Sequence, residues 1–261
     1  MKARVTIELD WQLNRCVIRN AYANPPFRLM DISPDRGSDR VELMLMSSAP
    51  GMMDADFFEW EIQLAPRSTL QLHTQSYQRI FPATTQARQE IRVHVPEHAT
   101  LIYLPHPAVP HAQSAYSGLN QYFLHQGSRL AVAEIITCGR KLNGEQFLFR
   151  TYQAKTEIYL NDELVVHENL LVMPKEADPL LLGELEGFTH QASLLLVGWN
   201  DDVDWMLQEV RTFLADTPDL EFGASRLPVK GISVRLLGNG AELLHRTVTD
   251  LAGLFTKVTR L

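Results

Sequence analysis

The sequence predicts a mainly β protein that forms one domain over residues 1–261, with two α-helices near its C-terminus. Residues 1–195 read mostly as short strands with alternating apolar and polar side chains, separated by turn residues, which is typical of antiparallel sheets. Apolar stripes at helical spacing occur only in residues 196–261, with one strand between them. No fixed repeat and no long linker divides the chain, so a single domain accounts for its length.

The clearest early strand is the stretch RQEIRVHV at residues 88–95. Its apolar residues occupy every second position, and Arg92 and His94 share the opposite face. Proline cannot donate to a strand ladder, so Pro96 ends this strand.

A three-stranded meander is predicted next. Strands 130–142 and 145–160 flank Asn143 and Gly144, a strong signal for a two-residue hairpin turn. A third strand, 164–173, follows an Asn-Asp turn. We therefore expect these three strands to pair consecutively.

The C-terminal segment predicts helix, strand and helix in that order. The first helix opens after Asp201 and Asp202, whose negative charge suits a helix N-terminus, and it stops before Pro218. A strand over residues 232–236 runs to a Gly-Asn-Gly turn. The apolar stripe of the first helix is Val203, Leu207, Val210 and Leu214, and that of the second is Leu244, Val248, Leu251, Phe255 and Val258.

The composition is that of a globular protein, with 45% hydrophobic and 21% charged residues. A formal net charge of -7 argues against nucleic acid as a partner, because phosphate binding relies on clustered Lys and Arg. Cys16 and Cys138 have no CxxC spacing, which fits a reducing compartment. Acidic residues near the start interrupt any signal peptide, and the longest apolar run, 194–199, is too short to span a bilayer. We expect a cytoplasmic protein that does not enter membranes.

Catalytic signatures are missing from the sequence. There is no GxxxxGK[ST], HExxH or GxSxG, and no GxGxxG after a strand, so we expect no enzyme activity. Two alternatives remain open. One is a hydrolase that uses a carboxylate pair such as Glu134 and Glu145. The other is a carbohydrate-binding β module that stacks sugars on Trp11, Trp60, Trp199 or Trp205.

Imidazoles are concentrated in the middle of the chain, and imidazole is a ligand for nickel, copper and zinc. Five of the nine histidines are His94, His98, His106, His111 and His125. Pro96 excludes a helical metal pair at His94 and His98. His106 and His111 flank a proline-rich turn that could hold two ligands apart, or they could be exposed loop residues that bind no metal.

Carboxylates offer further candidates. Asp54 and Asp56 would share one side of an extended strand and so could share a cation, or they could lie in a solvated turn. Arg140 and Glu145 are predicted to form a structural ion pair across the hairpin. Glu134 lies on the same strand face as Arg140 but far along it, so a buried Glu134 would need another partner.

Four segments in order resemble the UreD (UreH) family of urease accessory proteins. Residues 134–147, EIITCGRKLNGEQF, are similar to an acidic residue followed by GR, a gap and GExF. Residues 104–111 resemble LPxPxxP, residues 71–81 resemble TQsxxkiY, and residues 50–56 resemble GGxxxGD. Asp54 and Ala55 replace glycines of that last pattern, so a differently shaped turn is expected, because a non-glycine does not easily adopt positive φ.

The resemblance implies a helical stack of β-sheets with two helices, and a chaperone that loads nickel into urease. Its implied partners are a UreF-like protein, a UreG-like GTPase held through it, and apo-urease. The family is thought to pass nickel through an internal channel, so no tightly bound cofactor is expected, only transient nickel. The transient nickel candidates are Asp54, Asp56, His106, His111, Glu134 and Glu145. The structural motif is Gly139, Arg140, Asn143 and Gly144, and the expected partner surface surrounds Trp205 and Phe213.

Overall fold

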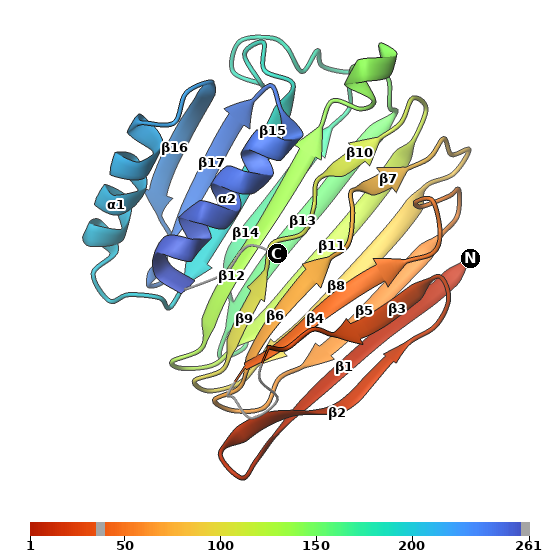
Figure 1. Ribbon diagram of the computed structural model, residues 1–261. Helices are drawn as coiled ribbons and strands as arrows, with labels where there is room; N and C mark the ends of the chain where they lie inside the picture. The colour runs from red at the N-terminus through yellow and green to blue at the C-terminus, as the bar shows by residue number, and fades with distance from the viewer. Residues whose placement is uncertain (35–39, 257–261) are drawn as a thin grey trace.

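Two large β-sheets face each other, and two helices cover the outer face of one of them (Figure 1). The computed structural model describes residues 1–34 and 40–256. Sheet A has seven strands in the order β14-β13-β11-β8-β5-β1-β2. Its strands are β1 (Lys2–Gln12), β2 (Arg15–Ala23), β5 (Phe57–Gln63), β8 (Ala87–Val95), β11 (Ala115–Leu124), β13 (Thr151–Leu160) and β14 (Glu163–Val172).

Sheet B has its main strands in the order β16-β17-β15-β12-β9-β6-β4-β3, with the short β10 paired to β12 and the short β7 paired to β10. Its strands are β3 (Phe27–Asp31), β4 (Arg40–Ser47), β6 (Thr69–Thr74), β7 (Gln78–Ile80), β9 (Thr100–Tyr103), β10 (Ala108–Pro110), β12 (Arg129–Thr137), β15 (His190–Val197), β16 (Leu220–Arg226) and β17 (Gly231–Gly238).

The central part of the chain winds back and forth between the sheets. From β4 to β13 the main strands alternate between sheet B and sheet A, so each returning strand lies parallel to the previous strand of its own sheet. This winding confirms a mainly β stack of mixed sheets with two C-terminal helices. The antiparallel pairing expected from the sequence is wrong for this central part, because alternation of apolar residues reports a half-buried strand and not its direction.

The predicted hairpin at Asn143 and Gly144 is also wrong. β12 pairs with β15 and β9 in sheet B, whereas β13 pairs with β11 and β14 in sheet A. The Asn-Gly pair instead ends a short 3-10 helix, η1 (Lys141–Asn143), where Gly144 takes the left-handed conformation with φ 78°. The chain does turn at these residues, but the turn lies in the connection from β12 of sheet B to β13 of sheet A.

Other local predictions are confirmed. In β8 the apolar residues Ile91, Val93 and Val95 are buried, and the polar residues between them face outward. β13 and β14 form an antiparallel hairpin across Asn161 and Asp162, which have φ of 50° and 68° as a tight two-residue turn requires.

The two helices pack on sheet B near the C-terminal end of the chain (Figure 1). α1 (Val203–Ala215) contacts β16 and β17, and α2 (Ala241–Thr256) contacts β15, β12 and β17. Asp202 caps α1 by accepting a hydrogen bond from the Trp205 amide at 2.9 Å. The predicted stripes are buried in the core of this layer, except that Val203 and Phe255 are partly buried and Val258 lies outside the described residues.

A second core fills the space between the sheets and is built from the inward residues of both. Within the described ranges, neither helix has the length and apolar character needed to cross a bilayer.

Candidate functional site

Sheet B is interrupted beside the middle of β12. β9 ends at Tyr103 and β10 begins at Ala108, and the four residues between them include Pro105 and Pro107, which carry no N–H for a ladder. β12 pairs through Val132 on one side of the interruption and through Ile136 on the other. We call residues 104–107 the window segment.

Glu134 lies on β12 opposite the window segment. It occupies the inward phase of the strand, between Val132 and Ile136, where an apolar residue would be expected. The Tyr152 hydroxyl donates a hydrogen bond of 2.9 Å to Glu134 Oε1. Burial raises the pKa of Glu134 to about 7, the Tyr152 hydrogen bond opposes this rise, and the nearby charge of Glu168 adds to it. Tyr152 is thus the partner that a buried Glu134 needs.

Four cavities follow one another past Glu134, and neighbouring cavities share lining side chains. The outer cavity, about 390 Å³, lies between β6, the window segment and α2, and His106 lines both it and the next. The window cavity, about 50 Å³, leads to Glu134, which also lines the inner cavity of about 70 Å³. Glu168 and Arg235 line both the inner cavity and the open cleft, about 590 Å³, between β14 and β16–β17. We call this series the cavity row.

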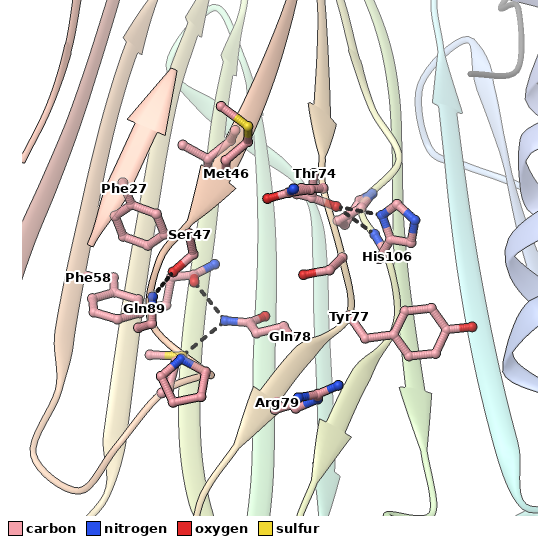
Figure 2. A pocket seen from close by; sticks show the side chains of 18 of the residues that line it. Phe27, Met46, Ser47, Phe58, Thr74, Tyr77, Gln78, Arg79, Gln89 and His106 are labelled. Carbon is pink, nitrogen blue, oxygen red and sulfur yellow. Dashed lines mark hydrogen bonds between the residues drawn. The ribbon is translucent and has the colours of Figure 1, made fainter. Parts of the chain in front are cut away.

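His106 stands at the junction between the outer and window cavities. Its backbone N–H donates to Thr74 Oγ1 at 2.9 Å, and its Nδ1 lies 3.0 Å from the same hydroxyl (Figure 2). Its ring stacks on His245 of α2, with 4.5 Å between ring centroids. Burial, and then the charge of His245, lower the pKa of His106, so the imidazole is neutral and able to bind a metal at neutral pH.

A side cavity of about 210 Å³ opens at the same histidine (Figure 2). Its walls combine aromatic rings such as Phe27 and Phe58 with three glutamines, and the Gln78 side chain donates to Gln89 Oε1 at 2.9 Å. Gln78 and Gln89 also line the window cavity, so this polar pair extends the polar lining towards Glu134.

The outer cavity is bordered by a second histidine. His73 Nε2 lies 3.3 Å from Glu42 Oε2, and Arg40 Nε lies 3.0 Å from the other oxygen of that carboxylate. Burial is the main cause that lowers the pKa of His73, and the hydrogen bond to Glu42 opposes it. The imidazoles of His73 and His106 line the outer cavity opposite α2, and the Glu242 carboxylate of α2 lines it as well.

The opposite end of the cavity row carries an ion pair. Arg235 Nη2 of β17 lies 3.3 Å from Glu168 Oε1 of β14, and the Ser233 hydroxyl donates to the same oxygen at 3.4 Å. The Glu168 side chain is 18% exposed and that of Arg235 is 62% exposed. The pair bridges sheets A and B at the place where the row reaches solvent.

His111 and Glu145 do not join the cavity row. Arg140 Nε donates to Glu145 Oε2 at 2.9 Å, which confirms the predicted ion pair, although η1 and not a hairpin brings the two together. The Ala112 amide donates to the same carboxylate at 3.2 Å. His111 is buried against Phe81, so the reading of it as an exposed loop residue is wrong. Burial, and then the charge of Arg140, lower its pKa.

Asp54 and Asp56 lie in a turn, which is one of the two readings of the sequence, and the other reading, a shared side of an extended strand, is wrong. Asp54 accepts hydrogen bonds from the amides of Thr84 and Thr85, at 2.9 Å and 3.0 Å, and the contacts with these threonines hold its pKa well below the ordinary value. Asp56 is buried and accepts from the Met53 amide and the Met1 amino group, each at 2.8 Å. Each carboxylate thus has its own protein donors.

Ala55, between these two carboxylates, has φ 60°. Alanine thus adopts here the left-handed conformation that a non-glycine does not easily adopt. Gly139 shows the opposite case, with φ 117° and a position where a Cβ would lie 2.9 Å from the Pro110 carbonyl oxygen. Gly139 therefore has a backbone conformation that residues with a Cβ rarely adopt.

The six nickel candidates are thus spread over three places, and only His106 and Glu134 line the cavity row. Within residues 1–34 and 40–256, no group of three or more His, Cys, Asp or Glu is placed to hold a metal ion together. The hydrolase pair is also separated, since Glu134 bonds Tyr152 between the sheets and Glu145 bonds Arg140 at η1.

The tryptophans do not share one stacking surface. Trp60 is buried between the sheets, and Trp199 donates its indole N–H to the Leu130 carbonyl at 2.8 Å. On α1, Trp205 is 43% exposed and packs edge-on against Phe255, with 5.8 Å between ring centroids. Phe213 packs partly buried against the core under the helices.

Sequence reasoning missed Glu168, Arg235, His73 and His245. Strand phase would have found Glu168, because it shares the inward face of β14 with the buried Val166. The same signal marks Glu134 in β12. His245 carries no comparable signal, since its role depends on where α2 packs.

Comparison with known proteins identifies the family of this chain. The sequence model described as UreD urease accessory protein matches residues 1–260. A urease accessory protein UreD of Flavobacterium johnsoniae is 40% identical over 93% of this chain and 88% of its own length. Those of Acetivibrio thermocellus and Haemophilus influenzae strain 86-028NP are 30% and 31% identical, over 94% and 92% of this chain and 93% and 90% of theirs. The chain therefore belongs to the UreD family of urease accessory proteins.

Proposed function

We propose that this protein is a nickel-delivery chaperone and scaffold for urease, and that nickel ions pass along the cavity row. The observation that carries the proposal is Glu134, an acidic side chain placed in the inward phase of β12 beside the window segment, with a cavity on each side of it. An inward carboxylate is costly for a fold, and while Tyr152 bonds Oε1, a cation that passes between the two cavities would be a further ligand of this group.

The groups along the row suit transient contacts with nickel. His106 offers a neutral imidazole, and Glu134 and Glu168 offer carboxylates, in separate positions along the row. Imidazole and carboxylate are hard or borderline ligands, and one or two at a time hold a divalent ion weakly, which favours release. In this proposal a nickel ion leaves each position along the row, because no position supplies enough ligands for a full coordination sphere.

The scaffold part of the proposal rests on the family and on α1. The relatives are named urease accessory proteins, which supports a role beside urease and not a catalytic one. We propose that a UreF-like protein binds this chain around Trp205 and Phe213, holds a UreG-like GTPase, and docks with it on apo-urease in the cytoplasm. Exposed aromatic residues are common at the centres of such interfaces.

The test is urease activation by Glu134→Gln in cells that carry the matching urease genes, at limiting nickel. Glutamine keeps the volume and the acceptor for Tyr152 but removes the charge that attracts a cation. We expect lower urease activity and less nickel per urease, while the variant still co-purifies with the UreF-like protein. Glu90→Gln, on the outer face of β8 and outside the row, is the matched control. Full urease activation in cells that carry Glu134→Gln would refute the proposal that nickel passes along the cavity row.

A further inference from the structure

The end of the cavity row at the open cleft, which we call its mouth, carries the permanent positive charge of Arg235. Arg235 lies on β17, opposite Ser193 of β15 and Gly223 of β16 in the ladder, and its side chain reaches Glu168 on the edge strand of the other sheet. The neighbouring residues Val234 and Leu236 face the helices and are buried. Arg235 therefore faces the space between the sheets.

Two carboxylates and this one guanidinium line the inner cavity. Glu134 and Glu168 both border it, and the charge of Glu168 is felt at Glu134. A divalent cation in so small a space is attracted by both carboxylates, which would retain it. Arginine stays protonated at any physiological pH, so its charge always competes for Glu168.

The competitor is held loosely. The Arg235 side chain is 62% exposed, and it makes one contact of 3.3 Å with Glu168 rather than a two-pronged pair. An exposed ion pair of this kind contributes little stability, so the guanidinium leaves and returns at small cost. Arg235 also lines the open cleft, where water can solvate the displaced guanidinium.

We propose that Arg235 is a tethered competitor cation that sets how strongly the mouth of the cavity row holds a divalent metal. A metal ion binds Glu168 by displacing the guanidinium, and the returning guanidinium helps to release it. This inference rests on the proposed function of the cavity row. It assigns Arg235 a role in metal affinity and release, through Glu168, and no direct contact with the metal.

The experiment measures nickel binding to the purified full-length protein by equilibrium dialysis against nickel chloride. Arg235→Gln should bind nickel roughly fivefold more tightly, the upper end of what an exposed ion pair contributes. Arg235→Lys keeps the charge and should stay near the wild type. The double variant Arg235→Gln with Glu168→Gln should lose the gain, because the freed carboxylate is then absent.

The matched control is Arg226→Gln, since Arg226 is also an exposed arginine on a sheet-B strand paired to a carboxylate, that of Asp204, away from the row. In cells at limiting nickel, Arg235→Gln should lower urease activation while Arg226→Gln does not. The proposal that Arg235 competes with the metal is overturned if Arg235→Gln leaves the nickel affinity unchanged. It is also overturned if Arg226→Gln raises the nickel affinity equally. If Glu134→Gln still lowers urease activation in that case, the proposed nickel passage stands without a role for Arg235. If neither Glu134→Gln nor Arg235→Gln has an effect, both proposals fail.

Discussion

Replacing Glu134 by glutamine should stabilise the folded protein while it impairs urease activation. The carboxyl group is held in the inward phase of β12, where burial raises its pKa from the ordinary value of 4.5 to about 7. Above pH 7 the folded state therefore carries a poorly solvated charge. Glutamine keeps the acceptor for the Tyr152 hydroxyl and removes that charge.

The magnitude follows from the difference between the two pKa values. A pKa of about 7 against 4.5 corresponds to roughly 3 kcal/mol at most, and solvent in the two adjoining cavities reduces this to about 1–3 kcal/mol. Because the folded pKa is raised, the folded state binds the proton more tightly than the unfolded chain. The wild type therefore loses stability as pH rises from about 4.5 to about 7, and its deficit is constant above pH 7.

The assay is urea unfolding of the wild type and Glu134→Gln at pH 5 and pH 8. The variant should gain about 1–3 kcal/mol at pH 8 and much less at pH 5. Thermal unfolding should follow, with a rise of about 2–4 °C per kcal/mol for a chain of this size. A variant that is equally destabilised at both pH values would show that the carboxylate is satisfied in its charged form, and would refute the reasoning.

Three further changes test other parts of the structure. Gly139→Val should destabilise the fold by about 2–4 kcal/mol, because its Cβ would meet the Pro110 carbonyl at positive φ, and unchanged urea unfolding would contradict this. Ala55→Gly should stabilise it by about 0.5–1 kcal/mol in the same measurement, since φ is 60°, and a loss would argue against the turn. Trp205→Asp should abolish co-elution with the UreF-like protein in size exclusion, whereas Leu13→Asp, at a 90% exposed site, should not. Retained co-elution of the first variant would move the partner surface away from α1.

Asp54 and Asp56, two of the nickel candidates, have structural roles, so their substitution would test folding as well as nickel transfer. Asp56 is buried with two donors of its own, so its replacement should affect folding, contrary to the expectation for an exposed transit residue. Asp54 bonds two threonine amides of a neighbouring loop and supports that loop. His106 and Glu134 are thus the predicted residues that report on passage with least disturbance elsewhere.

Local features of the fold could be read from the sequence because they depend on neighbours in the chain. The turn at Asn161 and Asp162, the cap at Asp202 and the alternation of β8 each arise within a few residues. The Asn143–Gly144 signal was of the same kind, and the chain does turn there. What the signal could not indicate is which strands lie on either side of the turn.

The sequence by itself determined the mainly β composition and the two helical stripes, because side-chain periodicity acts locally. Only the tertiary structure decided the parallel winding between two sheets and the cavity row. His106, Glu134, Glu168 and Arg235 come from four separate segments, and they meet because strand register is set by burial across both sheets. Such pairing links residues far apart in the chain, whereas alternation in one strand reveals only which side chains face inward.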